Sequence, residues 1–246
     1  MRFNSALFTT FLFASAVLAI RRRGSESRLL DLVEKATKAT SGVEYTHNWA
    51  GAICRQDTGT IVMVSGVIAV PDMSTVEAGS VASAWVGIDG DTCKNAALMT
   101  GVVFGKTHNG PFYQAMYWSS PDTTETPENI TISAGDVVRL TVGALAGPTV
   151  LQFTLVENFS NKQSAIKFQN HSQELCGQNA EWVVINYAEE GIPFPNFGTA
   201  TFTDASALSE GLIFGPLEAT ILEIKQNGQV LTSVSVDNSS VTIKYL

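Results

Sequence analysis

The chain has 246 residues, enough for one sizeable domain or two small ones with a buried core. Its 15 Lys and Arg face 23 Asp and Glu, but residues 1–42 hold 7 of the basic and only 3 of the acidic residues. The rest of the chain therefore holds 8 basic and 20 acidic residues, a net charge of −12. This acidic body argues against nucleic acid or an anionic membrane as a partner. It repels itself least where carboxylates are partly protonated, which predicts adaptation to acidic pH.

The N-terminus has the pattern of a secretory signal peptide over residues 1–19. Arg2 precedes an apolar stretch from Ala6 to Leu18 that is too short to span a bilayer, and the small residues Ala16 and Ala19 lie near a plausible cleavage site. Residues 20–42 contain a basic cluster and a short amphipathic stretch unlike the sequence downstream, which predicts a removable pro-segment. We therefore expect a secreted, extracellular protein whose mature domain spans residues 43–246.

From residue 43 onward the sequence predicts strands and no helix. Residues 151–155 and 241–245 alternate apolar and polar side chains, as half-buried antiparallel strands do, and residues 61–70 form a near-continuous apolar run. Asn227-Gly228 between two such runs is typical of a two-residue hairpin turn. Many short strands with polar turns indicate an all-β sandwich, and no internal repeat or linker divides it.

Three cysteines in an oxidising compartment predict one disulfide and one free thiol. Their spacing does not indicate which two cysteines are bonded. Four Asn-X-Ser/Thr motifs are candidates for N-glycosylation in a secreted protein. Their asparagines are Asn129, Asn158, Asn170 and Asn238.

The usual hydrolase motifs are missing or incomplete. Asp57-Thr58-Gly59 is the tripeptide of pepsin-like peptidases, but that chemistry needs a second such aspartate and the sequence has none. The three histidines lie far apart without a metal-binding spacing, and no Gly-X-Ser-X-Gly elbow is present. We expect neither a metal nor another cofactor.

Six stretches nevertheless occur in a familiar order. They are "NWAGA" (48–52), "ASAWVGIDGDTC" (82–93), "ISAGDVVRLTV" (132–142), "CGQNAEWVV" (176–184), "PNFGTATFT" (195–203) and "ILEIKQNGQVLTSVSV" (221–236). Together they resemble the glutamic peptidase (eqolisin) family of secreted acid endopeptidases, over roughly residues 43–246. The resemblance implies a concanavalin-like sandwich of two bent antiparallel sheets with a concave groove for a polypeptide. We expect a monomer. It also implies a Cys93–Cys176 disulfide, which leaves Cys54 unpaired.

In the family a glutamate and a glutamine hold the attacking water between them. The glutamate acts as general base and then acid, and the glutamine amide donates to the oxyanion. The glutamate of the family's "AEW" motif corresponds to Glu181. The family pattern GIDGDTCxxAILQTGVDF aligns without gaps with "GIDGDTCKNAALMTGVVF", so the glutamine position is Met99. A thioether has no donor and is a weak acceptor, so we do not expect Met99 to replace the amide.

Further departures fall close to Met99 in the sequence. The aspartate of the family's "GVDF" is Val103, and the groove tryptophan of "YDAWYEWYPD" corresponds to Met116, with Trp118 at the following acidic position. Other positions match the family's groove residues: Trp49, Trp85, Asp89 and Phe197. Because Asp89 and Asp91 belong to a turn, we expect both to make hydrogen bonds behind the site.

The favoured interpretation is a glutamic-peptidase homologue impaired at the catalytic glutamine, which binds peptide in its groove. Two alternatives remain open at this point. One is a working acid endopeptidase in which another amide, with Gln114 as the named candidate, replaces the glutamine. The other is a lectin-like carbohydrate binder, which the sandwich shape permits.

Overall fold

The computed structural model describes residues 42–246 except residues 58, 94, 120–122, 146–150, 171–174 and 188–192. The signal peptide and nearly all of the pro-segment expected from the sequence lie outside the described residues. Residues Thr40–Leu246 form one compact unit that contains both sheets and the disulfide. No helix among the described residues has the length and apolar character needed to cross a membrane.

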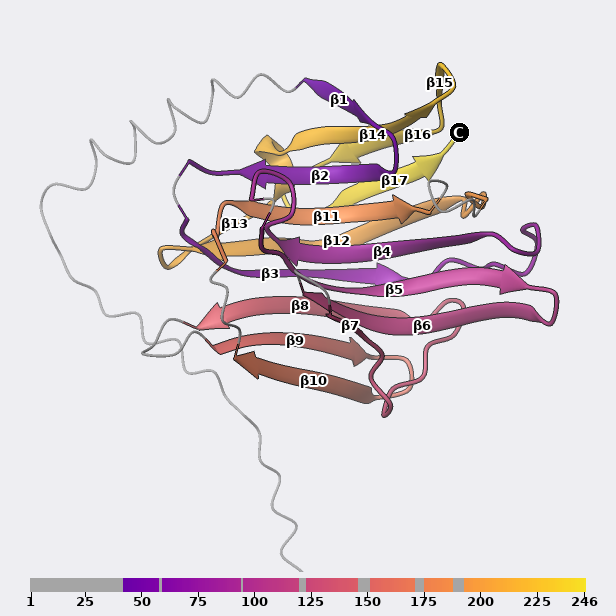
Figure 1. Ribbon diagram of the computed structural model, residues 1–246, viewed down its shortest axis with the longest axis horizontal. Coiled ribbons are helices and arrows are strands. Elements are labelled where there is room, and N and C mark those ends of the chain that lie inside the picture. The colour runs from indigo at the N-terminus through magenta and orange to yellow at the C-terminus, as the bar shows by residue number, and fades with distance from the viewer. Residues whose placement is uncertain are drawn as a thin grey trace, which may run out of the picture. The chain divides into compact units, whose positions relative to one another are not determined.

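The described residues form two stacked sheets, here called sheet A and sheet B (Figure 1). Sheet A has the strand order β1 (Val43–Thr46), β14 (Thr220–Gln226), β2 (Trp49–Arg55), β11 (Asn179–Asn186), β4 (Val81–Ile88), β5 (Leu98–Thr107), β6 (Gly110–Ser119) and β7 (Thr123–Glu125), with β15 (Gln229–Val230) beside β14. Sheet B has the order β10 (Gln163–Asn170), β9 (Leu151–Asn158), β8 (Val137–Leu145), β3 (Ile61–Ala69), β12 (Thr199–Ser209), β17 (Val241–Tyr245) and β16 (Thr232–Val236), with β13 (Leu212–Phe214) beside β12.

The pairings confirm the expected all-β sandwich. Every pairing between described strands is antiparallel except that of β1 with β14, which is parallel. The expected hairpin at Asn227-Gly228 joins β14 to β15, and both turn residues have positive φ angles, 50° and 81°. This conformation is the one that makes Asn-Gly the preferred pair in two-residue hairpins.

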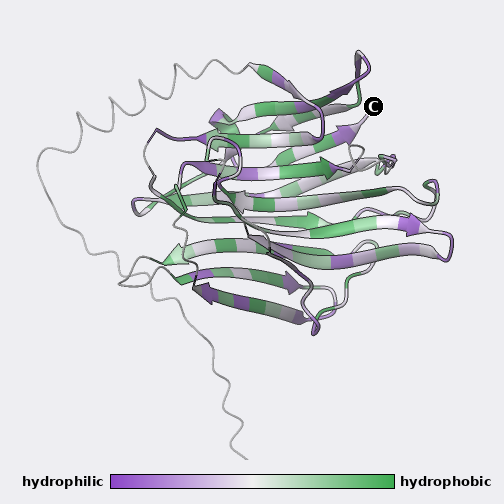
Figure 2. Ribbon diagram, viewed as in Figure 1, coloured by the Kyte–Doolittle hydropathy of each residue, from purple (hydrophilic) through white to green (hydrophobic). Residues whose placement is uncertain are grey.

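A large apolar core lies between the sheets. Its biggest side chains, among them Trp182, Phe104 and Phe202, are fully buried. The Trp182 indole N–H is also satisfied there, because it donates to the Ser65 carbonyl of sheet B at 2.9 Å. Hydrophobic and hydrophilic residues alternate along many strands (Figure 2), as expected when the two faces of a sheet meet different surroundings.

Strand β9 has its polar face inward. Gln152, Thr154 and Asn158 are buried, whereas the alternate apolar residues of this strand are half-buried on the outer face. The Asn158 amide donates to the Thr131 carbonyl at 2.9 Å and to Asp136 at 2.6 Å. Alternation in the sequence therefore predicts the strand but not which face is buried.

The glycosylation candidates differ in exposure. The Asn158 side chain is 1% exposed and its amide nitrogen makes two hydrogen bonds in this fold. Asn129 and Asn238 are exposed. The side chain of Asn170 lies outside what the structure describes.

Candidate active site

Glu181 and Met99 belong to one row of side chains across sheet A. In the register of the sheet, Glu181 of β11 lies between Ile53 of β2 and Gly87 of β4, and Gly87 lies opposite Met99 of β5. Directly paired residues in a sheet share a face, so the Glu181 and Met99 side chains project from the same side. A single strand separates them, which places their backbones about 10 Å apart.

The Met99 side chain lies over Gly87, the residue between it and Glu181. A Cβ atom added to Gly87 would fall 2.8 Å from Met99 Cε and 2.9 Å from Met99 Cγ. Glycine is therefore required at position 87 to leave room for a long side chain from β5. Met99 fills this space completely and is 0% exposed.

The Glu181 carboxyl group is closed off from solvent. It is 0% exposed, and neither carboxyl oxygen makes a hydrogen bond with the described residues. The turn after β4 covers it, since a Cβ added to Gly90 would lie 3.7 Å from Glu181 Oε1 and 3.7 Å from the Trp49 ring. A buried polar group without a partner is rare in folded proteins and is often functional.

Burial raises the pKa of Glu181 well above its ordinary value, and the negative charges of Asp91 and Asp89 raise it further. The Asp91 backbone amide and the Arg55 charge act in the opposite direction and more weakly, and the amide contact falls short of hydrogen-bond geometry. The neutral acid is therefore favoured well above the pH at which an ordinary carboxyl group loses its proton. A carboxyl group of this kind suits general acid–base chemistry.

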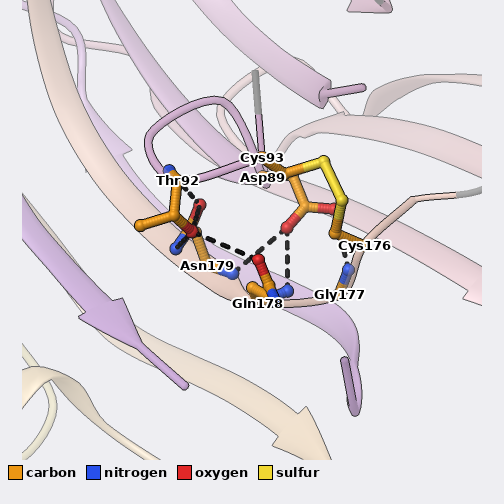
Figure 3. The surroundings of a disulfide bond; sticks show 7 residues. All are labelled: Asp89, Thr92, Cys93, Cys176, Gly177, Gln178 and Asn179. Carbon is orange, nitrogen blue, oxygen red and sulfur yellow. Dashed lines mark hydrogen bonds between the residues drawn. A yellow bond between two sulfur atoms is a disulfide. The ribbon is translucent and has the colours of Figure 1, made fainter. Parts of the chain in front are cut away.

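The turn that covers Glu181 is anchored by Asp89 (Figure 3). Asp89 has a φ angle of 64° and is fully buried. Its carboxylate accepts hydrogen bonds from the backbone N–H groups of Gly177 at 2.8 Å, Gln178 at 2.8 Å and Asn179 at 3.2 Å. Asp89 thus lies behind the site, as its place in the turn suggested, and does not line the groove.

The Cys93–Cys176 disulfide holds the same turn, which confirms the expected pairing (Figure 3). Asp89 lies within 4.8 Å of both sulfur atoms, but sulfurs bonded to each other are not thiolate ligands for a metal ion. The remaining cysteine, Cys54, is buried, and burial raises the pKa of its thiol to about 12. Its thiol therefore stays protonated and unreactive.

Arg55 at the end of β2 is a part of the site that the sequence did not indicate. Its Nε donates to Asp91 at 2.5 Å, and its two terminal nitrogens donate to the Glu44 carboxylate at 2.7 and 2.9 Å. Arg55 thus connects the turn over Glu181 to strand β1. Nothing in "CRQDTG" distinguishes this arginine from an exposed one, because its partners lie 11 and 36 residues away.

Apolar side chains cover the same face of sheet A. Met99 and Val103 pack with Ile53, Trp85, Val183 and Leu222 in a buried cluster separate from the main core. Beside this cluster is a hollow of about 360 Å³, here called the aromatic hollow. Its lining residues are Trp49, Trp85, Met116, Trp118, Thr124, Ile185 and Tyr187. Thr124, Ile185 and Tyr187 were missed from the sequence. Ile185 is four residues after Glu181 on the same strand and therefore on the same face, which is the signal that could have found it.

The peptidase A4 family model matches residues 47–245. The chain belongs to the peptidase A4 family. Aspergillopepsin-2 of Aspergillus niger is 38% identical over 247 aligned positions, which cover 91% of this chain and 84% of that protein. Scytalidopepsin B of Scytalidium lignicola is 34% identical and covers 81% of this chain and 78% of its own length.

Solved structures agree with this assignment to the peptidase A4 family. Scytalido-glutamic peptidase with a transition state analog inhibitor superposes with a TM-score of 0.71 at 32% identity, covering 81% of this chain and 98% of that one. Aspergilloglutamic peptidase from Aspergillus niger gives a TM-score of 0.61 at 41% identity, covering 68% and 99%. The fold and the glutamic-peptidase relationship expected from the sequence are thereby confirmed.

Phe197, which we expected in the groove of this peptidase A4 member, lies elsewhere. It is in the core between the sheets, where its ring packs against Phe104, Phe194 and Tyr245 with ring centroids 5.6–6.4 Å apart. The "PNFGT" motif fixes its place in the alignment, but the side chain points into the sandwich. A motif match therefore did not give the direction of the side chain.

Gln114 is too far from Glu181 to replace the missing amide. It lies on β6, three strands from β11 and four residues along from the row that contains Glu181, a separation of roughly 15–20 Å. Its amide nitrogen instead donates to Thr126 Oγ1 at 2.9 Å. Gln114 and Glu181 belong to the same sheet, as the sequence suggested, but their side chains do not meet.

Proposed function

We propose that this protein is a catalytically impaired glutamic-peptidase homologue that binds peptide in its groove without efficient cleavage. The single observation that supports this most is the side chain of Met99, which fills the space over Gly87 beside the buried Glu181 carboxyl group. That space is where the resemblance puts the amide that positions the water.

The chemical argument rests on what a thioether lacks. A glutamine amide donates hydrogen bonds to a developing oxyanion, whereas methionine offers only a weak sulfur acceptor. Removing one oxyanion donor slows other hydrolases by about 10²–10³-fold. Here the same amide also positions the water, so we expect a larger loss.

Other features support retention of a peptide site. Glu181 remains with a raised pKa, and the anchored turn over it is intact. Solved relatives hold a peptide-based transition state analog and the tripeptide Ala-Ile-His. The N-terminal signal pattern and the disulfide support secretion as part of the proposal.

Cleavage of an unfolded protein substrate across pH 2–7 tests the proposal, with a chain that starts at Val43, the first residue of the expected mature domain. The parent is expected to be inert, and Met99→Gln is expected to gain acid activity of at least about 10²-fold over background. Adding Glu181→Gln should remove the gain, and Met99→Leu, which restores no amide, should stay inert. A parent that already turns over, with activity lost in Glu181→Gln, would show a working endopeptidase instead.

A further inference from the structure

We propose that a cleft at the open edge of the sandwich, between β7 and β10, holds the first N-acetylglucosamine of an N-linked glycan attached to Asn129. This inference rests on the secretion that is part of the proposed function, because sequons are modified in secreted proteins. It is independent of what sheet A binds beside Glu181.

The cleft, here called the edge cleft, lies where both sheets end. Strand β7 is the last strand of sheet A and β10 is the last strand of sheet B (Figure 1). An ion pair between Glu125 of β7 and Lys167 of β10 joins these two strands, and both residues line the cleft. Its volume of about 470 Å³ lies within the range of small-ligand sites.

The edge cleft is separate from the site around Glu181. Tyr117 lines the cleft and packs in the core between the sheets, whereas its neighbour Trp118 lines the aromatic hollow. Successive side chains of a strand point to opposite faces, so strand β6 separates the two sites.

Asn129 lies at the rim of the edge cleft on a fixed segment of backbone. Its side chain is exposed and lines the cleft. Ile130 is buried in the core, and the Thr131 backbone N–H and hydroxyl donate to Gln163 Oε1 at 2.7 and 2.8 Å. A sugar on Asn129 is therefore tethered beside the cleft, which gives it a high effective concentration there.

The lining suits the hydroxyl and acetamide groups of a neutral sugar. Lys167 compensates the charge of Glu125, and Glu128 adds an exposed carboxylate that repels anionic ligands but accepts hydrogen bonds from sugar hydroxyls. Ser164 adds an exposed hydroxyl, and Pro127 adds apolar surface for the ring carbons. The mixture of acceptors, donors and apolar surface matches a sugar better than it matches a charged ligand.

Tyr117 gives independent support for a ligand in the edge cleft. It is 6% exposed, and its hydroxyl makes no hydrogen bond with the described residues. Burial raises the pKa of Tyr117 to about 12, so the hydroxyl keeps its proton and remains a donor. Buried polar groups without a partner are rare, and a sugar oxygen that reaches Tyr117 would supply the partner.

The full chain, secreted from a yeast, tests the inference. Endoglycosidase H trims each glycan to one N-acetylglucosamine, and peptide mass spectrometry gives the occupancy of Asn129 and Asn238. Asn238 is the matched control, because it is an exposed sequon that does not line the edge cleft. We expect Asn129→Gln to melt about 2–4 °C below the parent, and Asn238→Gln to melt with it. The same variants made without sugar in a bacterial periplasm should all melt with their parent.

Two further substitutions test whether the cleft carries this effect. Ser164→Trp fills the cleft from an exposed position on β10 and should abolish the loss caused by Asn129→Gln. Tyr117→Phe removes only the hydroxyl and should reduce that loss, while costing nothing in the chain without sugar. Phe168→Trp changes an exposed residue of β10 that does not line the cleft and should leave the loss unchanged.

The outcomes separate this inference from the secretion on which it rests. Equal losses in Asn129→Gln and Asn238→Gln, or a loss that Ser164→Trp leaves unchanged, would show that the sugar acts without the cleft and would overturn the inference. An unmodified Asn129 in a chain that carries sugar on Asn238 would overturn it while secretion stands. A chain that carries no sugar on either residue would count against secretion and the inference together.

Discussion

Glu181 and Met99 are neighbours with opposite chemistry. Glu181 is a buried carboxyl group whose surroundings favour its protonated form. Met99 is an apolar side chain that neither donates nor accepts a proton. The proposed impairment is compatible with a stable fold, because Met99 packs well in the apolar cluster and an uncharged Glu181 tolerates burial. The fold therefore does not depend on an amide at position 99.

The raised pKa of Glu181 makes a signed prediction about stability. Below the ordinary carboxyl pKa, Glu181 is protonated in both the folded and the unfolded chain. Its protonation then does not change the free energy of unfolding. As the pH rises above that value, the unfolded chain loses the proton first, so the free energy of unfolding falls until the pH passes the folded pKa. Over that range the free energy of unfolding falls by about 1.4 kcal/mol for each pH unit.

Urea unfolding at pH 3 and pH 7 measures this effect in Glu181→Gln. The variant should gain stability relative to the parent on going from pH 3 to pH 7. Glu44→Gln is the control with the opposite sign, because the hydrogen bond from Arg55 lowers the pKa of Glu44. That variant should lose up to about 1 kcal/mol at pH 7, since the pair is partly exposed, and less at pH 3, where protonation of Glu44 weakens the pair in the parent. A pH-independent difference for Glu181→Gln would contradict the assigned titration.

At the scale of elements, the turn between β4 and β5 organises the site. Asp89, the Cys93–Cys176 disulfide and the Arg55–Asp91 pair all hold it against neighbouring strands. The family motif in the sequence indicated that this turn is part of the site and that its Cys93 is bonded to Cys176. It gave no sign of Arg55, whose role depends on which distant strands become neighbours.

Removing the disulfide should destabilise both the domain and this turn. The bond links residues 83 positions apart, and loss of such a bond costs about 2–5 kcal/mol. Cys93→Ala/Cys176→Ala should therefore melt at a clearly lower temperature than the parent, and reducing agent should have no further effect on it. Cys54→Ala should keep the sensitivity of the parent to reducing agent. Equal sensitivity in the double variant would show that the disulfide is not the reduced group.

For the whole molecule, alternation and hairpin signals were sufficient to predict an all-β sandwich. They could not predict the strand order, since β11 lies between β2 and β4 although it begins only at Asn179, far beyond the end of either strand in the chain. They also could not assign faces, as β9, Asp89 and Phe197 show. The direction of a side chain and the pairing of strands both depend on tertiary packing, and the pattern of a single sequence does not contain that information.

The acidic body and the uncharged hollow then have separate roles. Net charge governs solubility and long-range attraction, whereas the proposed peptide site depends on the residues beside Glu181. A peptide bound there meets a carboxyl group able to hold a proton but no amide at Met99 to stabilise an oxyanion. We therefore propose that the protein holds a peptide and leaves it intact.

The most direct test is to incubate a short peptide, acetyl-Ala-Ala-Phe-Ala-Ala-amide, with an equal concentration of the parent chain at pH 4 and to follow binding and peptide mass together over days. We predict a bound peptide whose mass remains that of the uncut molecule, while Met99→Gln cuts it under the same conditions. Cleavage by the parent at the rate of Met99→Gln, lost in Glu181→Gln, would contradict the account.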